Sequence, residues 1–133
     1  MRISIKTKGF NDVIDITSRI EEVVKGSKIK EGLVNIFVSG STAGLTLLEY
    51  EPGVVADLKT TLEKIAPMEG EYAHEQAWHD GNGYAHIRSA LLKPSLSVPI
   101  KDGGMILGTW QQIVLIDFDN KARSREIHIT VVS

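Results

Sequence analysis

Three of the four histidines in this 133-residue chain lie within thirteen residues, from His74 to His86. His74, His79 and His86 are five and seven residues apart, and these spacings do not place two imidazoles on one helix face. Imidazole is the commonest metal ligand and the side chain that titrates nearest neutral pH. The segment therefore predicts a metal or acid–base site, or else a polar surface loop that contains histidine by chance.

A metal site in this segment would have to be assembled by folding. Glu49, Glu75 or Asp80 would supply a carboxylate ligand, or would accept a hydrogen bond from an imidazole N–H. Zinc suits such a set, because catalytic zinc sites have three protein ligands and one open position. His128 differs from the other histidines: it lies on the polar side of an alternating segment and is predicted to be solvated.

Two further segments carry groups that suit an anion. Small residues follow a buried strand at 39–44, where the backbone N–H groups and the hydroxyls of Ser41 and Thr42 would hold phosphate. The segment lacks the Gly-Lys-Ser/Thr of a P-loop, and a tight turn between two strands explains it equally well. Arg123 and Arg125 alternate on one face, either to meet an anionic ligand or as part of a solvated edge strand.

A third segment places a hydroxyl, an indole and an amide in a row, at Thr109, Trp110 and Gln111. The indole would stack on a heterocycle and the amide would hydrogen-bond to it. The alternative is a strand with a bulge at Gly108.

The elements that position these groups follow from hydrophobic periodicity. Thr17 or Ser18 caps a short helix that ends at Gly26, and with Ser18 as the cap Glu21 completes a capping box. Pro52 suits the first turn of a helix over 52–65. A shorter helix over 85–92 has Asn82 as its cap. Strands are predicted at 1–8, 32–38, 96–100, 105–109, 110–117 and 126–132. Strands dominate the second half without intervening helices, which predicts an α+β fold with mixed, mainly antiparallel sheets and two main helices.

Composition restricts the possible functions. The length predicts a single domain over 1–133, and the absence of cysteine excludes disulfides and thiolate chemistry. The net charge of −2 gives no basic footprint for nucleic acid. No run approaches the roughly 20 apolar residues of a membrane span, and the N-terminus does not read as a signal peptide. We expect a cytoplasmic protein without a nucleic-acid or membrane partner.

Several of these segments together resemble the YjbQ-like family, also called the secondary thiamine-phosphate synthase family. The resemblance extends over essentially the whole chain. It is carried by Gly-Ser-Thr-Ala-Gly-Leu-Thr-Leu-Leu-Glu-Tyr-Glu-Pro-Gly at 40–53, Tyr72-x-His74, Asn82 to His86, and the run from Ser95 to Gly108-Thr109-Trp110-Gln111-x-Ile113.

The resemblance implies a small α+β domain that assembles as a homotrimer, with its polar cluster near subunit boundaries. The implied activity couples a pyrimidine pyrophosphate to a thiazole phosphate and releases pyrophosphate, as a secondary activity. Carried over by position, the implied catalytic residues are Glu49, His74, His86 and Arg125, and the implied ligand-binding residues are Ser41, Thr42, Thr109, Trp110 and Gln111. His74, His86 and Glu49 would hold a divalent metal such as zinc.

The chain departs from the family pattern at two positions. His79 lies where many relatives have another residue, and Gly40 stands where many bacterial members have histidine. The chain also has no Asp-rich magnesium motif. Two alternatives therefore stay open: a non-catalytic trimeric protein that binds phosphate or another small molecule, and a polar cluster that mainly holds the trimer together.

Overall fold

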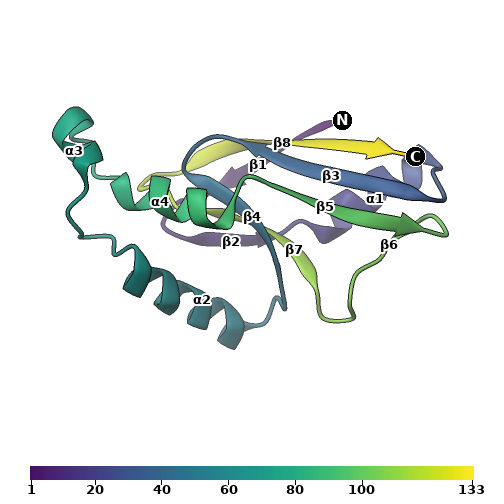
Figure 1. The fold of residues 1–133 in the computed structure, drawn as a ribbon, viewed down its shortest axis with the longest axis horizontal. Coiled ribbons are helices and arrows are strands. Elements are labelled where there is room, and N and C mark those ends of the chain that lie inside the picture. Colours follow the sequence, from purple (N-terminus) through teal and green to yellow (C-terminus); the bar gives the residue numbers. More distant parts are fainter.

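The computed structural model describes all 133 residues, which form two antiparallel β-sheets and four helices (Figure 1). The larger sheet has the strand order β1-β8-β3-β5-β6, and the smaller sheet has the order β2-β7-β4. The elements in chain order are β1 (Arg2–Thr7), β2 (Asp12–Asp15), α1 (Thr17–Ser27), β3 (Gly32–Ser39), β4 (Ala43–Leu48), α2 (Pro52–Ile65), α3 (Ala73–Trp78), α4 (Gly83–Leu92), β5 (Ser95–Lys101), β6 (Gly104–Met105), β7 (Gln112–Asp117) and β8 (Arg123–Val132). The predicted α+β class is confirmed; α1, α2 and α4 correspond to predicted helices, and α3 is an additional one.

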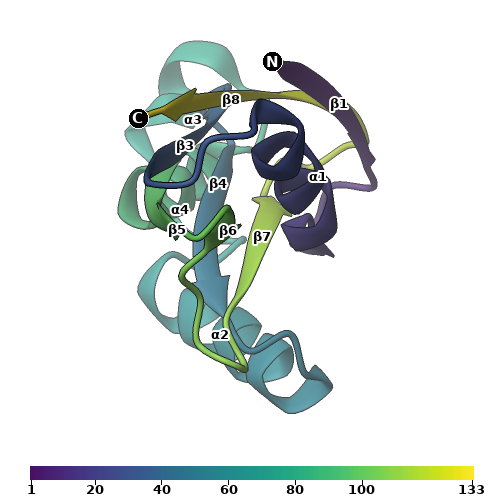
Figure 2. The ribbon, with the colours of Figure 1, turned by 90° about the vertical axis from the view of Figure 1, so that its right-hand side faces the viewer.

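The main core lies between the two sheets. Ile36 of β3 pairs in register with Ile129 of β8, and both pack with Leu115 of β7 and Ile20 of α1. Full burial of each such side chain contributes roughly 1.5–3 kcal/mol. Figure 2 shows α1 and α2 on the same side of β1 and β8, so the opposite face of the larger sheet has neither helix over it.

Strand β7 is buried on both faces. Ile113 and Leu115 belong to the core between the sheets, whereas Val114 and Ile116 pack with residues of α2 and α4. A strand covered on both sides has no polar face, which explains its continuous apolar run. The two acids that follow this run, Asp117 and Asp119, are fully buried and belong to the candidate site described below.

Helix α2 begins as the sequence predicts, with Pro52 in its first turn. The Glu51 carboxylate accepts hydrogen bonds from the backbone N–H groups of Gly53 and Val54, both at 2.8 Å. These bonds favour the charged form and lower the pKa of Glu51.

The predicted boundaries of α1 were wrong. The helix starts at Thr17, whose N–H donates to Asp15 Oδ1 at 2.9 Å, so the Ser18 capping box does not form. The helix also continues through Gly26 and ends at Ser27, followed by Lys28 in the left-handed conformation. Asp15 therefore supplies the local acceptor that the sequence predicts from Thr17 or Ser18.

The second half differs from the prediction in three places. The strand predicted at 110–117 forms as β7 over Gln112–Asp117, but residues 106–111 are irregular. Gly108 and Gln111 close a turn there: the Gln111 N–H donates to the Gly108 carbonyl at 3.0 Å, and the Gly108 N–H donates to Gln111 Oε1 at 2.8 Å. Strand β8 begins at Arg123 and lies between β1 and β3, so it is not an edge strand. Part of the histidine segment forms the unpredicted helix α3.

No helix in the structure is both long enough and apolar enough to cross a membrane.

Candidate functional site

Most of the polar residues singled out from the sequence gather around one cavity of about 370 Å³, which we name the histidine–arginine pocket. The β3–β4 turn, α3 and the turn after it, the start of α4, and the β7–β8 connection meet there. The lining residues are Gly40, Ser41, Thr42, His74, Trp78, Asp80, Asn82, His86, Asp119, Arg123 and Arg125.

Two of the three clustered histidines face each other. The ring centroids of His74 on α3 and His86 on α4 are 4.4 Å apart, with the ring planes at 47°. The chain reverses between the two helices through His79 and Gly81, both of which have positive φ. His79 itself is exposed and does not line the pocket.

Carboxylates surround His74. Its Nε2 is 2.9 Å from Asp80 Oδ1, but the two atoms are not aligned for a hydrogen bond, so this buried nitrogen has no hydrogen-bond partner. Ligand-forming atoms of His74, Glu75 and Asp80 all lie within 4.8 Å of one another. Glu75 also accepts a hydrogen bond from the Gly83 N–H, at the start of α4. The carboxylates beside His74 are therefore Glu75 and Asp80.

Arg125 is held rigidly at the opposite wall. Its Nε and Nη2 donate to the two oxygens of Asp117 at 2.7 and 2.8 Å, and Nη2 also donates to Thr42 Oγ1 at 2.7 Å. The residue is only 7% exposed, so the alternative of a solvated edge strand was wrong for Arg125. A Cβ atom at Gly40 would lie 2.8 Å from Arg125 Nη1, so the glycine leaves room in front of this unpaired donor.

Asp119 joins the separate walls of the pocket. It is fully buried and accepts hydrogen bonds from the Asn120 N–H at 2.8 Å and from the side chains of Arg123, Thr42 and Asn82 at 2.9, 3.0 and 3.2 Å. Burial alone would raise the pKa of Asp119. The hydrogen bonds outweigh it and lower the pKa to about 2.

Donors without acceptors line the same wall. None of the backbone N–H groups of Gly40, Ser41 and Thr42 donates to an acceptor within the protein, and neither does Nη1 of Arg123 or Arg125. Consecutive free backbone N–H groups beside guanidinium groups form a site suited to an anion.

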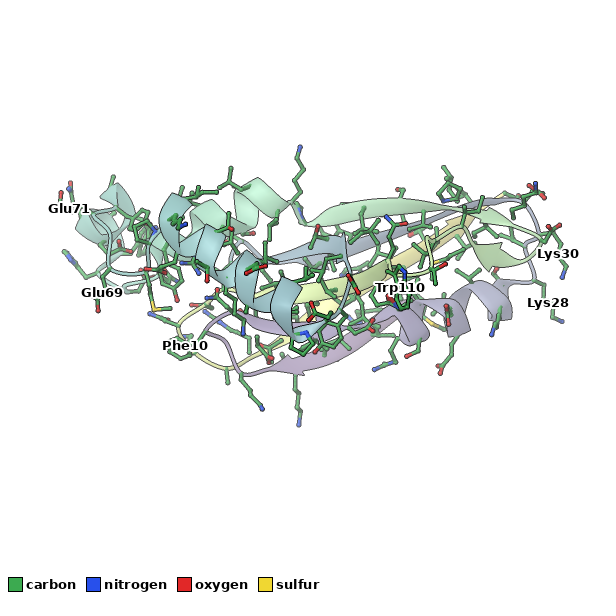
Figure 3. All side chains as sticks on the ribbon, turned by 90° about the horizontal axis from the view of Figure 1, so that it is seen from below. Phe10, Lys28, Lys30, Glu69, Glu71 and Trp110 are labelled. Carbon is green, nitrogen blue, oxygen red and sulfur yellow. The ribbon has the colours of Figure 1, made fainter.

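The remaining residues singled out from the sequence lie elsewhere in the chain. Glu49, Thr109 and Trp110 line a second hollow of about 440 Å³, and Gln111 belongs to the turn described above. Figure 3 shows Trp110 well away from the end of the molecule where Glu69 and Glu71 precede α3. Glu49 is thus not among the residues that line the histidine–arginine pocket, and the proposed grouping of Glu49 with His74 and His86 does not form within one chain.

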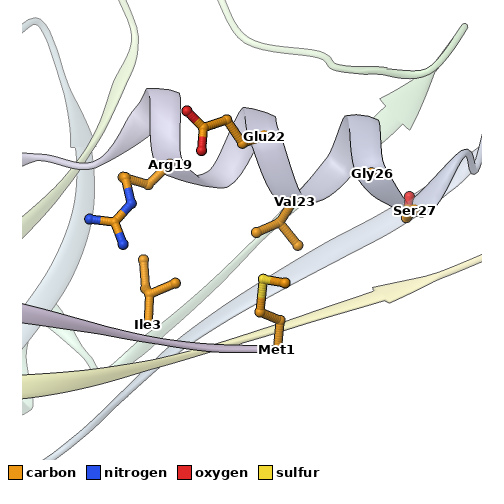
Figure 4. A pocket seen from close by; sticks show the side chains of 7 residues that line it. All are labelled: Met1, Ile3, Arg19, Glu22, Val23, Gly26 and Ser27. Carbon is orange, nitrogen blue, oxygen red and sulfur yellow. The ribbon is translucent and has the colours of Figure 1, made fainter.

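A third cavity lies between β1 and α1, as Figure 4 shows. Met1, Ile3 and Val23 give it an apolar floor, with Arg19 and Glu22 at its margin. It contains no histidine and no cluster of metal-ligating groups, so it is not the candidate site.

Sequence reasoning did not identify Asp117, Asp119 and Asn82 as site residues. The one signal for the two acids was their position, directly after the apolar run that forms β7. Asn82 was predicted to cap α4, but its side chain makes no capping bond and instead donates to Asp119. Trp78 is 73% exposed and lies at the rim of the pocket.

The fold and the pocket together define a single-domain α+β protein in which two antiparallel sheets support one polar pocket of histidine, arginine and buried aspartate. Comparison with known proteins gives the particular family. The model of the UPF0047 protein YjbQ-like family matches residues 1–133, and the chain belongs to this family.

Curated relatives cover nearly the full chain. A UPF0047 protein from Methanocaldococcus jannaschii is 36% identical over 132 residues, which are 98% of this chain and 92% of that protein. The UPF0047 protein YugU from Bacillus subtilis is 33% identical over 132 residues, which are 98% and 96% of the two chains.

Solved structures of this family have the same fold. An uncharacterized conserved protein of the YjbQ/UPF0047 family from Clostridium acetobutylicum superposes with a TM-score of 0.90 at 32% identity and covers 99% of each chain. A YbjQ-like protein of unknown function from Sulfolobus solfataricus superposes with a TM-score of 0.89 at 28% identity, over 98% of this chain and 95% of that one.

Proposed function

We propose that the histidine–arginine pocket binds a phosphate-bearing small molecule. The observation that carries this proposal is the set of unpaired donors on one wall: three consecutive backbone N–H groups at 40–42 and Nη1 of Arg123 and Arg125. A phosphate group has several acceptor oxygens and satisfies such a set, with the charge-assisted bonds from the arginines the strongest.

We further propose that a divalent cation such as zinc binds beside the phosphate. Asp117 pairs with Arg125 and Asp119 pairs with Arg123, so these four charges cancel. Asp80 and Glu75 remain, and with neutral imidazoles they give the pocket a net negative charge. A divalent ion would reverse this charge and favour an anion. The unpartnered Nε2 of His74, with two carboxylates near it, suits such an ion; His86 completes the imidazole pair.

Binding of inorganic phosphate tests the first proposal. Arg123 is partly exposed, so Arg123→Ala removes a donor without emptying a buried position. We expect isothermal titration to give at least about tenfold weaker phosphate binding for this variant, the loss typical of one charge-assisted hydrogen bond. Arg19→Ala, at the margin of the apolar cavity, is the matched control and should bind as the wild type does. A wild-type chain that does not bind phosphate or pyrophosphate would refute the proposal.

We also propose a specific reaction for this pocket, in which a pyrimidine pyrophosphate is coupled to a thiazole phosphate with release of pyrophosphate. Both substrates are anions, and the departing pyrophosphate gains charge. The arginines and the N–H groups at 40–42 would bind this group, and a divalent ion, when bound, would neutralise its charge. Measurement of pyrophosphate release from the two substrates tests this step. Phosphate binding without any release would instead favour the alternative, a non-catalytic binding protein.

A further inference from the structure

Trp78 is a large apolar side chain that the fold leaves uncovered beside the histidine–arginine pocket. It is 73% exposed and belongs to neither apolar core of the chain, yet it lines the pocket. An indole left in water forgoes the free energy that burial of an aromatic ring provides. On the rim of a pocket, such a ring is available to whatever molecule the pocket binds.

The position of Trp78 on α3 places it on the same side of the helix as His74. The two residues are four apart in this helix, and residues at this spacing share one helix face. Aromatic side chains on a helix also lean toward its N-terminus, which is the direction of His74. His74 lines the pocket and packs its ring against that of His86. The indole therefore lies on the pocket side of α3.

Helix α3 is attached to the rest of the pocket on both sides of Trp78. Before Trp78, the Glu75 carboxylate accepts a hydrogen bond from the Gly83 N–H at 2.6 Å, at the start of α4. After Trp78, the Asp80 carbonyl accepts a hydrogen bond from the side-chain amide of Asn120 at 2.8 Å, on the β7–β8 connection. These bonds hold the ring at the rim although it is not buried. A ligand that contacts the indole does not have to order this segment first, which favours binding.

The lining and the volume of the pocket indicate what the indole would contact. Trp78 is the only hydrophobic residue among the eleven that line the pocket, so it is the one apolar surface open to the part of a ligand beyond the phosphate. The volume of about 370 Å³ is near the lower end of small-molecule sites, which are roughly 300–1,000 Å³. A phosphate group attached to a single ring is a ligand of this size.

We propose that Trp78 stacks on an aromatic ring of the ligand and is a specificity-determining residue of the pocket. Aromatic rings pair with an indole in offset-stacked or edge-to-face arrangements, and an alkyl group does not form these contacts. The pocket then prefers phosphate esters of a single aromatic ring over alkyl esters. This inference rests on the proposed binding of a phosphate-bearing molecule and specifies the part of that molecule beyond the phosphate.

Three esters test the proposal by isothermal titration: phenyl phosphate, benzyl phosphate and ethyl phosphate. The two aromatic esters place the ring at different distances from the phosphate. We expect at least one of them to bind wild-type protein about tenfold tighter than ethyl phosphate, the gain typical of one stacked ring. Trp78→Ala should bring this ratio close to one, and Trp78→Phe, which keeps an aromatic face, should retain most of it.

Phe10→Ala is the matched control. Phe10 is also an exposed aromatic residue, at 56%, but it does not line the pocket, so this variant should keep the wild-type ratio.

The ratio separates stacking from other roles of Trp78. A Trp78→Ala variant that keeps the wild-type ratio would overturn the proposal, and a lower mass of that variant by light scattering would then assign the indole to a subunit contact. Aromatic esters that bind wild-type protein no tighter than ethyl phosphate would also overturn it, even if the variant does not fold, and would leave the proposed phosphate binding intact. No binding of any ester or of inorganic phosphate would refute both.

Discussion

At the scale of single residues, Asp119 determines whether the pocket keeps its shape. Its carboxylate accepts bonds from Thr42 on the β3–β4 turn, Asn82 before α4, and Arg123 on β8. These segments are far apart in sequence, and one ionised group holds them together. Loss of the charge therefore disturbs the anion-binding wall and the histidine side of the pocket at the same time.

Asp119 should make the stability of the fold depend on pH in acid. The pKa of Asp119 is lowered from 3.8 to about 2 in the folded chain, so its contribution is complete above pH 3.8 and is lost as the pH falls through 2. We expect about 2 kcal/mol of the free energy of unfolding to disappear over this window, as measured by urea unfolding at several pH values. Asp119→Asn should flatten the curve between pH 4 and 2, whereas Asp57→Asn, at an exposed position on α2, should not. Equal slopes for wild type and Asp119→Asn would contradict the assignment.

Binding of the proposed divalent ion should depend on His74. His74→Ala removes the imidazole whose Nε2 lies beside the carboxylates of Asp80 and Glu75, so we expect at least about tenfold weaker zinc or manganese binding by titration calorimetry. His128→Ala removes an exposed imidazole on β8 and should leave affinity unchanged. Elemental analysis of metal-replete wild-type protein that finds no bound metal would contradict the site.

At the scale of elements, two helical glycines predict opposite effects of the same substitution. A Cβ at Gly83 would lie 2.6 Å from Tyr72 Cβ and 2.7 Å from Glu75 Oε2, whereas a Cβ at Gly26 meets nothing within 4 Å. Gly83→Ala should lower the thermal midpoint by displacing the Glu75 carboxylate from the start of α4. Gly26→Ala should raise the free energy of unfolding by up to about 1 kcal/mol, the difference in helix propensity. Stabilisation by Gly83→Ala would show that the contact at α4 is looser than described.

Helices and strands were predicted best where the apolar residues follow one clear periodicity. The spacing of Val55, Leu58 and Leu62 together with Pro52 gave α2 its correct bounds, because amphipathic period and first-turn proline act locally. The prediction of strand over residues 106–111 was wrong. The Gly108 N–H donates to the Gln111 side chain and closes a turn there, which the residue types do not reveal.

The residues of the pocket were also predictable only in part, because many of their contacts join distant segments of the chain. Spacing alone did not distinguish the three clustered histidines, whereas the family resemblance singled out His74 and His86. The structure places these two rings against each other and leaves His79 exposed. Asp117 and Asp119 gained their roles only through contacts with Arg125, Thr42 and Asn82, which come from distant segments. Long-range pairing of this kind has no local pattern, so residue types and spacing did not specify it.

At the scale of the whole molecule, the uncovered face of the larger sheet is the feature that a single chain leaves unexplained. Leu33 of β3 lies opposite Val132 of β8, and both side chains point away from the core, with exposures of 46% and 51%. Phe37 follows on the same face and is 39% exposed. Exposed apolar residues grouped on one face are typical of a subunit interface. We therefore propose that the chain forms a homotrimer and that this face is its contact surface.

Light scattering of purified protein tests both the trimer and the surface. We expect wild-type protein at three times the 14.6 kDa chain mass, and Leu33→Lys at the mass of a single chain, because an ammonium group buried in the interface would be unpaired. Ile65→Lys places the same charge on the exposed side of α2, where Ile65 is 60% exposed, and should stay at the wild-type mass. A monomeric wild type would contradict the trimer, whereas a trimeric Leu33→Lys would place the interface on another surface. Dissociation that also weakens phosphate binding would indicate that the neighbouring chain contributes to the pocket.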